Sequence, residues 1–388
     1  MPPLHVCIVA PTASSILPGL NAQKAGGAEM QLRHIGRGFA RRGAHVSFVV
    51  EDVGQKDVEV VDGMDVLRCP FRYFGQSWRF FPSDTVRLVS LVHRLSPDML
   101  LFKTPRTLAL SLSFAQIGLN TKVIRIMASD SDCDLRFLPL PNMLYLMGSR
   151  MIHGTVFQSE AQAALAYRSL RLRGRVIPNI AHGMPTPAGT DSGPSDDASR
   201  RDIDCLWVGT CNANKCPLDF LEVVRALPGA RFTMIMAPGS DASLQQAITS
   251  QAASLVNLDY RGFIPYDRIG EFYRRARLVV HTSLREGFPN VFLQAWECGT
   301  PVVSTHVDPD HVITRHGLGR VSGRVIKVID DVRELLADEN QRAAISEACR
   351  HYLLSTHSPD AVIDQYLDYF RELGGGAKAA GLEKAGDA

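Results

Sequence analysis

The sequence predicts an α/β protein made of two doubly wound domains, each with a parallel β-sheet covered by helices on both faces. One reason is the length, because 388 residues exceed the roughly 250 to 300 at which a single hydrophobic core stops growing. A second is that short apolar runs alternate with amphipathic stretches, which is typical of strand–helix–strand units. We therefore expect two Rossmann-like domains, with a ligand cleft between them at the carboxyl ends of the strands.

The first half of the chain supplies the first set of these units. A helix is expected from about Ala28 to Arg42. Apolar side chains throughout each run indicate strands that are buried on both faces. The expected strands are, in order, HVCIVAP, HVSFVV, DMLLFK, KVIRIMA and GTVFQSE.

The second set begins after a connector rich in Pro, Gly, Ser and Asp. Its expected strands are IDCLWVG, ARFTMIMAP, LDYRGF, RLVVHTS and PVVST, with helices such as PLDFLEVVRALP between them. A last amphipathic helix follows from Ser358 to Leu373. The expected division is 1–183 for the first domain, 184–204 for a flexible linker, 205–356 for the second domain, 357–373 for a helix packing back toward the first domain, and 374–388 for a disordered tail.

Charge and cysteine content limit the class of protein. Residues 1–180 contain 21 Lys and Arg against 13 Asp and Glu, whereas the remainder contains 21 against 27. The basic half either meets an anion or anionic surface, or simply has an uneven set of solvated side chains. The eight cysteines show no CxxC pair and no zinc-ligand spacing, which is typical of reduced thiols in a cytoplasm and predicts no metal site.

Membrane association, if any, is expected to be peripheral. The N-terminus is interpreted as a first strand rather than a signal peptide, and no run reaches the roughly 20 apolar residues that a membrane span needs. The apolar segment Phe137 to Met151 has an arginine at each end, Arg136 and Arg150. It is interpreted either as a buried helix or as a segment that contacts a membrane surface.

The first candidate site is Gly26-Gly27-Ala28-Glu29, at the start of the first helix. Two glycines allow the backbone to approach a phosphate or a sugar closely, and a helix N-terminus favours negative charge. The pattern is not GxGxxG, so the dinucleotide fingerprint of hydride-transfer enzymes is missing. An ordinary turn from loop to helix remains the alternative.

The second candidate site is WVGTCNANK, directly after the first strand of the second domain. Gly209 permits a close backbone turn, and the ammonium group of Lys215 is suited to a diphosphate whose charge increases as it leaves. A solvated surface lysine is the alternative.

The third candidate site is the segment EGFPNVFLQAWECGTPVVS, from Glu286 to Ser304. The expected order is a turn at Gly287 and Pro289, a helix N-cap at Asn290, a short helix from Val291 to Cys298, a stop at Gly299, and a buried strand. This order places Glu286 beside a helix N-terminus, where it can accept hydrogen bonds from sugar hydroxyls. Gln294, about two helical turns further along, can bond a ribose edge.

These motifs resemble the retaining GT-B glycosyltransferases of the family 4 type. The resemblance covers nearly the whole chain: GGAE, VFQSE, VIPNI, the spacing of Gly209 and Lys215, and the segment that begins at Glu286 follow the family's order. It implies a GT-B architecture in which the first domain holds the acceptor and the second holds the nucleotide sugar.

The resemblance also implies roles for the site residues. Glu286 matches the first glutamate of the family's Glu-x7-Glu motif, which faces the donor sugar, and Lys215 matches the lysine that neutralises the donor diphosphate. Gly26 and Gly27 would close on the donor from the other domain. The loop whose backbone amides meet the donor would consist of Gly287, Phe288, Pro289 and Asn290, with Val291 beside it. No cofactor or divalent metal is needed, because the lysine, an arginine and helix dipoles supply the positive field.

This chain departs from the family pattern at three places. The second glutamate of the motif is Gln294, which is neutral and can also donate. An arginine common after the glycine is Thr210, so Lys215 would hold more of the diphosphate charge. The strand end that holds a histidine in many relatives is ASDSDCD here, where Asp130 or Asp132 would orient or deprotonate an acceptor hydroxyl.

The predicted function is retaining transfer of a sugar from a nucleotide-diphosphate-sugar to a hydroxyl acceptor, in surface polysaccharide or glycoconjugate biosynthesis. The acceptor would be a glycan, a lipid-linked glycan or a small hydroxyl compound, and we expect no nucleic acid partner. The protein would act in the cytoplasm, with peripheral association at the inner face of the membrane. The alternatives are a nucleotide-sugar 2-epimerase with the same architecture and a binding subunit that has lost catalysis.

Overall fold

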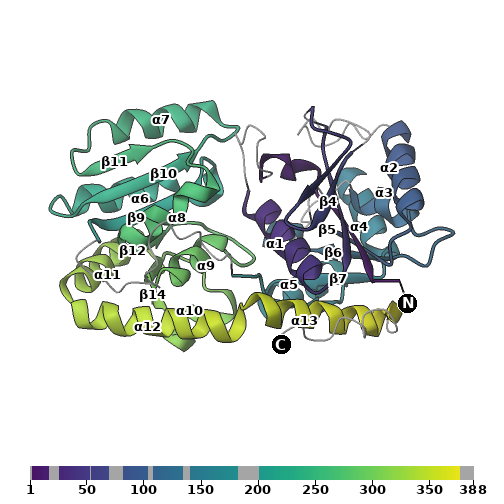
Figure 1. Cartoon of the computed structure of the whole chain (residues 1–388). Helices are drawn as coiled ribbons and strands as arrows, with labels where there is room; N and C mark the ends of the chain where they lie inside the picture. The colour runs from purple at the N-terminus through teal and green to yellow at the C-terminus, as the bar shows by residue number, and fades with distance from the viewer. Residues whose placement is uncertain are drawn as a thin grey trace. The chain divides into compact units, whose positions relative to one another are not determined.

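A computed structural model describes residues 2–16, 26–52, 54–69, 82–103, 108–133, 140–181 and 201–375 (Figure 1). The chain divides into two compact units. Unit 1 comprises Met1–Ile180 together with Ser358–Ala388, and unit 2 comprises Ala181–His357. Most of the predicted tail and most of the predicted linker lie outside the described residues, and the predicted cleft stays a prediction.

Unit 1 contains an eight-stranded sheet in the order β3-β4-β2-β1-β5-β6-β7-β8. All neighbours are parallel except β3 and β4, which form an antiparallel hairpin at one edge. The strands are β1 His5–Val9, β2 His45–Val50, β3 Val58–Val61, β4 Met64–Arg68, β5 Met99–Phe102, β6 Lys122–Ile126, β7 Gly154–Phe157 and β8 Arg175–Val176.

The helices of unit 1 come from both ends of the chain. They are α1 Gly27–Arg41, α2 Pro82–Leu95, α3 Leu108–Phe114, α4 Leu140–Met151, α5 Glu160–Leu170 and α13 Pro359–Phe370, with 3-10 helices at Pro11–Ile16 and Asp130–Asp132 and a π-helix at Arg371–Gly375. Helix α13 packs on α1, because Phe39 stacks at 5.3 Å on Phe370 and meets Tyr366 edge-on at 5.9 Å. Gly38 allows this approach, since a Cβ there would lie 2.5 Å from the Ile363 side chain.

Unit 2 contains a six-stranded, wholly parallel sheet in the order β11-β10-β9-β12-β13-β14. The strands are β9 Ile203–Thr210, β10 Phe232–Ala237, β11 Leu258–Arg261, β12 Ala276–His281, β13 Val302–Ser304 and β14 Gly319–Val321. The helices are α6 Pro217–Ala226, α7 Ala242–Ala252, α8 Tyr266–Arg275, α9 Asn290–Glu297, α10 Val312–His316, α11 Val325–Ala337 and α12 Glu339–Thr356, with 3-10 helices at Ala213–Lys215 and Pro309–His311.

The sheet of unit 2 is buried on both faces, as its apolar strands predict. Successive side chains of a strand point to opposite faces, so Trp207 joins the core with α6, α7 and α11, whereas Leu206 joins the core with α8, α9, α10 and α12. Both units are therefore α/β units built on mostly parallel sheets, and this part of the fold prediction is confirmed.

Three local features differ from the sequence expectations. The hairpin β3–β4 and the strand β14 were not expected, since each is short and only partly buried. Asn290 is not the N-cap of α9: Pro289 occupies that position with extended backbone angles, and Asn290 is the first helical residue. The end at Gly299 is as expected, because this residue has a φ of +60°, which favours glycine.

Candidate active site

The candidate site of unit 2 lies at the carboxyl ends of the neighbouring strands β9 and β12. In parallel sheets, ligands bind in the loops that follow the strands at this edge. One loop runs from the end of β9 to Cys216, and the other runs from the end of β12 to Pro289. The predicted residues Lys215 and Glu286 lie in these two loops.

The structure brings Lys215 and Glu286 into direct contact. The Nζ atom of Lys215 donates to Oε1 of Glu286 at 2.5 Å, and the two side chains are 22 % and 18 % exposed. An ion pair this far from bulk water is screened less than a surface pair. The pair therefore places one cation and one carboxylate together where a donor would meet both.

A chain of hydrogen bonds fixes the backbone of Lys215. Its amide donates to Oδ1 of Asn212 at 3.1 Å, and its carbonyl accepts from the Thr282 hydroxyl at 2.6 Å. The same hydroxyl oxygen accepts from the indole N–H of Trp207 at 2.9 Å. Trp207 is 2 % exposed, so the position of Lys215 is tied to the core beneath it.

The loop that holds Glu286 is tied to the loop that holds Lys215. The amide of Leu284 donates to the carbonyl of Asn214 at 2.8 Å, and the Asn214 side chain donates to the carbonyl of Arg285 at 2.9 Å. Paired loops of this kind pre-organise the groups that they present. The distance between Lys215 and Glu286 is thus set by backbone contacts as well as by their own ion pair.

Gly209 and Thr210 end β9 next to these loops. A Cβ on Gly209 would lie 2.7 Å from the Trp207 ring, so this glycine makes room for the indole rather than for a turn with positive φ. Thr210 is exposed at the end of the strand. Both residues lie at the end of β9, next to the loop that holds Lys215.

The segment after Glu286 is more deeply packed than the sequence indicates. The Phe288 ring is 6 % exposed and contacts the rings of Trp296 and His357. Pro289 has no backbone N–H, so it cannot donate to a ligand as expected. Gly287 is buried, whereas Asn290 and Val291 are half-buried at the start of α9.

Gln294 lies inside unit 2 with 7 % exposure. Its Oε1 accepts a hydrogen bond of 2.8 Å from the hydroxyl of Tyr273. Burial raises the pKa of Tyr273 well above its usual value, so this hydroxyl is a donor at neutral pH. The oxygen expected to bond a ribose thus has a partner within the domain, and a neutral amide suits this buried position better than a carboxylate.

His281 is a site residue that the sequence reasoning missed. It is the last residue of β12, is 3 % exposed and packs edge-on against Phe292. Neither ring nitrogen has a hydrogen-bond partner among the residues that the structure describes. Burial, followed by the charge of Lys215, holds the pKa of His281 well below its usual value, so the imidazole beside Lys215 is neutral. The sequence feature that could have identified this residue is a histidine at the end of an apolar strand.

In unit 1, Gly26 and Gly27 lie at the start of α1, as predicted. Gly26 is the N-cap residue with extended backbone angles, and Gly27 begins the helix. The Glu29 carboxylate folds back over this turn, because a Cβ on Gly26 would lie 2.3 Å from its Oε2. Its Oε1 accepts a hydrogen bond of 2.6 Å from the Thr12 hydroxyl, so in this structure a carboxylate covers the turn that was expected to meet a donor.

Asp130 and Asp132 have different surroundings in the 3-10 helix after β6. Asp132 is 7 % exposed, accepts from the Ala128 amide at 3.1 Å and pairs with Arg125 at 3.7 Å. Asp130 is half-buried and accepts from the Gln162 side chain at 3.4 Å. Of the two, Asp130 has the more accessible carboxylate for an acceptor hydroxyl.

Lys103, directly after β5, is a second residue that the sequence reasoning missed. It is 2 % exposed, and burial lowers its pKa to about 8, although the carboxylates of Glu29 and Asp132 act in the opposite direction. Lys103 follows β5, Asp132 lies in the 3-10 helix after β6, and Glu29 lies in the first turn of α1. The cluster is apparent from the folded structure alone, because its three residues are far apart in the sequence.

Residues 202–353 match the family model for glycosyl transferases group 1. The matched residues lie within unit 2. The prediction of a glycosyltransferase is confirmed for this domain, and the Lys215–Glu286 pair lies within it. The family model leaves the remainder of the chain unmatched.

Curated proteins similar to part of this chain include D-inositol 3-phosphate glycosyltransferases. The protein of Mycobacteroides abscessus is 28% identical over 202 residues, covering 49% of this chain and 45% of the relative. The protein of Mycobacterium tuberculosis H37Ra is 28% identical over 191 residues, covering 47% and 39%. The chain thus spans less than half the length of these relatives.

Solved structures resemble nearly the whole chain at low sequence identity. Sucrose-phosphate synthase from Thermosynechococcus elongatus superposes with a TM-score of 0.75 at 15% identity, covering 96% of this chain and 100% of that one. Anabaena HepE, in complex with UDP and glucose, gives 0.70 at 14% identity, covering 95% and 100%. These likenesses show the fold, and the predicted GT-B fold class is confirmed.

Proposed function

We propose that the protein is a retaining glycosyltransferase that moves a sugar from a nucleotide-diphosphate-sugar to a hydroxyl acceptor. The observation that carries the proposal is the Lys215–Glu286 pair, held at the ligand-binding edge of the group 1 domain. A nucleotide sugar presents a diphosphate and a polyhydroxyl ring side by side, and this pair offers a cation for the first and a carboxylate for the second. HepE, of the same fold, has UDP and glucose in its structure.

In the proposed reaction the acceptor oxygen bonds to the anomeric carbon, and the bond from that carbon to the diphosphate breaks. The electron pair leaves with the diphosphate, whose charge Lys215 and the N-terminus of α9 stabilise. Glu286 positions the sugar through its hydroxyls. The acceptor proton passes to a base, for which Asp130 is the candidate on unit 1. Because these groups supply the positive charge, we propose that no divalent metal or other cofactor is required.

Two residues are expected to tune donor binding. Thr210 replaces a cation at the end of β9, so Lys215 holds a larger share of the diphosphate charge. Gln294 is engaged by Tyr273, so the ribose is held by other groups or after this bond is exchanged. We propose that nucleotide selection in this protein depends less on the end of the Glu286 segment than the family motif suggests.

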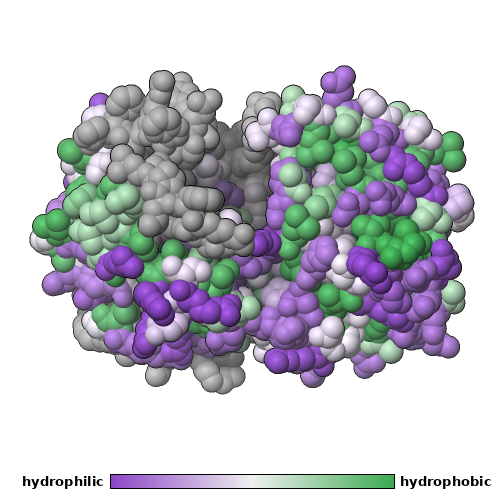
Figure 2. All heavy atoms as spheres, turned by 180° about the vertical axis from the view of Figure 1, so that it is seen from behind, coloured by the Kyte–Doolittle hydropathy of each residue, from purple (hydrophilic) through white to green (hydrophobic). Residues whose placement is uncertain are grey.

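We further propose that unit 1 binds a glycan or lipid-linked acceptor at the surface of an anionic membrane. Helix α4 packs one side through Tyr145 and exposes Met143, Met147 and Met151, which are 48 %, 53 % and 41 % exposed. These residues follow a spacing of four, so they share one helix face. Seen from behind, the surface of the molecule shows green apolar atoms among purple hydrophilic ones (Figure 2).

The charge of the first 180 residues fits this membrane proposal, because 21 Lys and Arg exceed 13 Asp and Glu. Arg150 is exposed next to Met151, and Phe114 at the end of α3 and Ile117 in the turn after it are exposed as well. Among the described residues, no helix is both long and apolar enough to cross a bilayer. The expected place of action is the cytoplasmic face of the membrane.

The experiment first screens UDP-, GDP- and ADP-sugars by thermal shift on the wild-type protein. A donor at 100 times its dissociation constant stabilises a fold by about 2.7 kcal/mol. Transfer is then followed by nucleoside diphosphate release with a membrane extract as acceptor, and NMR of the product reports the anomeric configuration. Lys215→Ala and Glu286→Ala are each expected to lose transfer and to stay folded, whereas Glu271→Ala, an exposed change on α8, is the matched control. Full activity in both site variants contradicts the proposal.

Assays with the same protein and donors distinguish glycosyl transfer from two other functions. A nucleotide-sugar 2-epimerase would convert the donor into an epimer without any acceptor, which chromatography of the donor alone detects. A binding subunit without catalysis would bind the nucleotide sugar and release no diphosphate. We favour transfer, because the observed pair combines a cation for the leaving group with a carboxylate for the sugar.

A further inference from the structure

Unit 2 contains a cavity of about 730 Å³ whose lining includes neither Lys215 nor Glu286. It lies at the amino ends of the strands: Arg201 precedes β9, Arg277 is the second residue of β12, and Pro301 precedes β13. Residues from the end of α11 and from α12 complete the wall. The Lys215–Glu286 pair lies at the carboxyl ends of β9 and β12, so the cavity is at the opposite edge of the sheet.

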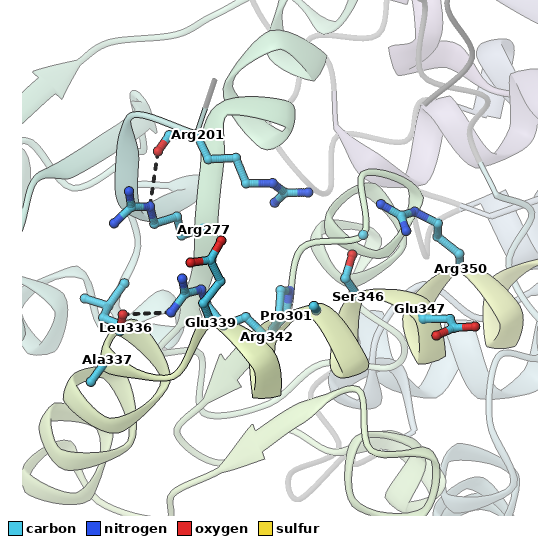
Figure 3. A pocket seen from close by; sticks show the side chains of 12 residues that line it. Arg201, Arg277, Pro301, Leu336, Ala337, Glu339, Arg342, Ser346, Glu347 and Arg350 are labelled. Carbon is cyan, nitrogen blue, oxygen red and sulfur yellow. Dashed lines mark hydrogen bonds between the residues drawn. The ribbon is translucent and has the colours of Figure 1, made fainter. Parts of the chain in front are cut away.

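Four arginines line this cavity, namely Arg201, Arg277, Arg342 and Arg350. Arg342 and Arg350 are eight residues apart on α12 with Ser346 midway between them, so all three share one helix face. Figure 3 shows the guanidinium groups of Arg201 and Arg350 extending toward each other above the Ser346 hydroxyl. The cavity thus concentrates positive charge around a polar floor.

The arginines are held partly by uncharged oxygens. Arg201 donates to the carbonyls of Ala276 and Cys298 at 2.5 and 2.7 Å, and to the Thr300 hydroxyl at 3.0 Å. Arg342 donates to the carbonyls of Leu335 and Leu336 at 2.5 and 2.7 Å, the second of which is drawn in Figure 3. Carbonyls and hydroxyls orient a guanidinium without neutralising it.

Acidic side chains offset part of this charge. Arg277 pairs with Asp204 at 3.0 Å. The lining contains two carboxylates, and that of Glu347 points away from the arginines in Figure 3. Burial and the charge of Arg277 lower the pKa of Arg342, which is the effect expected where cations are crowded together.

We propose that this cavity is a binding site for a small organic phosphate, with the phosphate between Arg201 and Arg350 above Ser346. Guanidinium groups match phosphate oxygens in a planar, bidentate manner. The volume is in the range of cavities that hold small ligands, about 300 to 1,000 Å³. No aromatic ring is among the twelve residues of the lining, so a phosphorylated sugar fits better than a nucleotide whose base needs a stacking partner.

This site is independent of the proposed transfer reaction. The eight residues of β9 separate the two edges of the sheet, which corresponds to about 25 Å at the rise of an extended strand. Elements β9, β12 and α9 nevertheless touch both places, because Arg201 holds the carbonyl at the end of α9 and Asn290 begins that helix near Glu286. Because the cavity lies apart from the Lys215–Glu286 pair, its occupancy can be measured by binding alone, without any assay of transfer.

The test is isothermal titration of the whole protein with glucose 6-phosphate at constant ionic strength, with glucose and inorganic phosphate as the comparison ligands. Wild-type protein is expected to bind glucose 6-phosphate at one site, more tightly than inorganic phosphate, and not to bind glucose. Arg350→Gln removes one guanidinium and is expected to weaken binding about tenfold to hundredfold. Ser346→Glu places a carboxylate where the phosphate would lie and is expected to abolish binding.

Two controls keep the result specific. Arg333→Gln removes an exposed arginine of α11 outside the cavity and is expected to leave binding unchanged, as is Lys215→Ala at the other edge of the sheet. The proposal is overturned if wild-type protein does not bind glucose 6-phosphate, if it binds inorganic phosphate equally well, or if Arg333→Gln weakens binding as much as Arg350→Gln. Loss of binding in Lys215→Ala alone would also overturn it, because it would assign the ligand to the donor site.

Discussion

The ammonium group of Lys215 and the carboxylate of Glu286 lie 2.5 Å apart at the carboxyl edge of the second sheet. In this arrangement the carboxylate occupies the place where a diphosphate oxygen would meet the lysine. In the proposed function, a donor would therefore exchange one anion for another, and its sugar would engage the carboxylate that is displaced. We therefore expect Glu286 to favour a diphosphate that carries a sugar over one that does not.

Glu286→Gln is accordingly expected to separate nucleotide binding from transfer. The amide keeps the shape but frees the charge of Lys215, so the nucleoside diphosphate alone should bind several-fold tighter, whereas transfer should fall about 10²- to 10³-fold. Isothermal titration with the diphosphate of the preferred donor and a release assay give the two values. The exposed change Glu271→Gln should alter neither. A parallel loss of both activities would show that Glu286 does not compete for Lys215.

Thr282→Val should destabilise the domain by removing the hydroxyl that holds the backbone of Lys215. The hydroxyl of Thr282 bonds the Lys215 carbonyl and accepts from the buried Trp207 indole, so the nearly isosteric valine leaves two polar groups unsatisfied. We expect a loss of about 1 to 3 kcal/mol in the free energy of unfolding, measured by urea denaturation. Thr249→Val, at an exposed helical position, is the control and should change stability little.

Gln294→Glu should destabilise the protein in a pH-dependent way. The new carboxyl would be almost fully buried beside Tyr273, so its pKa in the folded state rises above its unfolded value of about 4.3. The folded state then binds more protons than the unfolded state, and stability falls as the pH rises above about 4.3. We expect a deficit of about 2 kcal/mol at pH 7.5 that shrinks toward pH 4.5. Gln251→Glu, on the surface of α7, should show no such trend.

Lys103→Met should stabilise unit 1 at neutral pH. The pKa of Lys103 is lowered from 10.5 to about 8, so the unfolded state binds the proton more strongly between these values. Wild-type stability therefore rises with pH over that interval, and the advantage of the methionine variant, up to about 3 kcal/mol at pH 7, should vanish near pH 10.5. Urea unfolding at pH 7 and 9.5 tests the trend, with exposed Lys56→Met as the control. An advantage that is constant with pH would contradict it.

Met147→Glu should weaken membrane binding if the exposed face of α4 contacts lipid. A carboxylate in that face adds a desolvation cost and repels anionic headgroups. Sedimentation with vesicles rich in phosphatidylglycerol is expected to pull down wild-type protein and much less of the variant. Leu354→Glu, at an exposed position of α12 in unit 2, is the matched control. Equal binding of the wild type and Met147→Glu would contradict the assignment of this face.

The sequence was informative wherever local chemistry decides the structure. Buried parallel strands follow from uninterrupted apolar runs, and the stop of α9 follows from Gly299, whose left-handed backbone few other residues adopt. The pairing of Lys215 with Glu286 was not stated from the sequence, although both residues were singled out. Strand order decides that pairing, since β9 and β12 are neighbours only in the folded sheet.

The sequence did not predict the residues whose contacts and pKa values depend on how deeply they are buried. Gln294 was expected to face a ribose, but its contact with Tyr273 is set by the packing of α8 on α9. His281 and Lys103 have displaced pKa values because they are desolvated, and a residue's depth depends on the whole fold. The short strands β3, β4 and β14 escaped because a half-buried strand of three to five residues has little periodicity to detect.

Helix α13 belongs to unit 1 although it follows unit 2 in the sequence, and this order affects how the protein folds during translation. The core around Phe39 is completed by Tyr366 and Phe370, which leave the ribosome only after all of unit 2 has been made. Unit 2 is continuous in sequence, so it has every residue it needs while unit 1 still lacks its last helix. We therefore expect unit 1, although translated first, to reach its native state last, and chains released before residue 370 to expose Phe39 and the apolar face of α1 around it to chaperones and proteases.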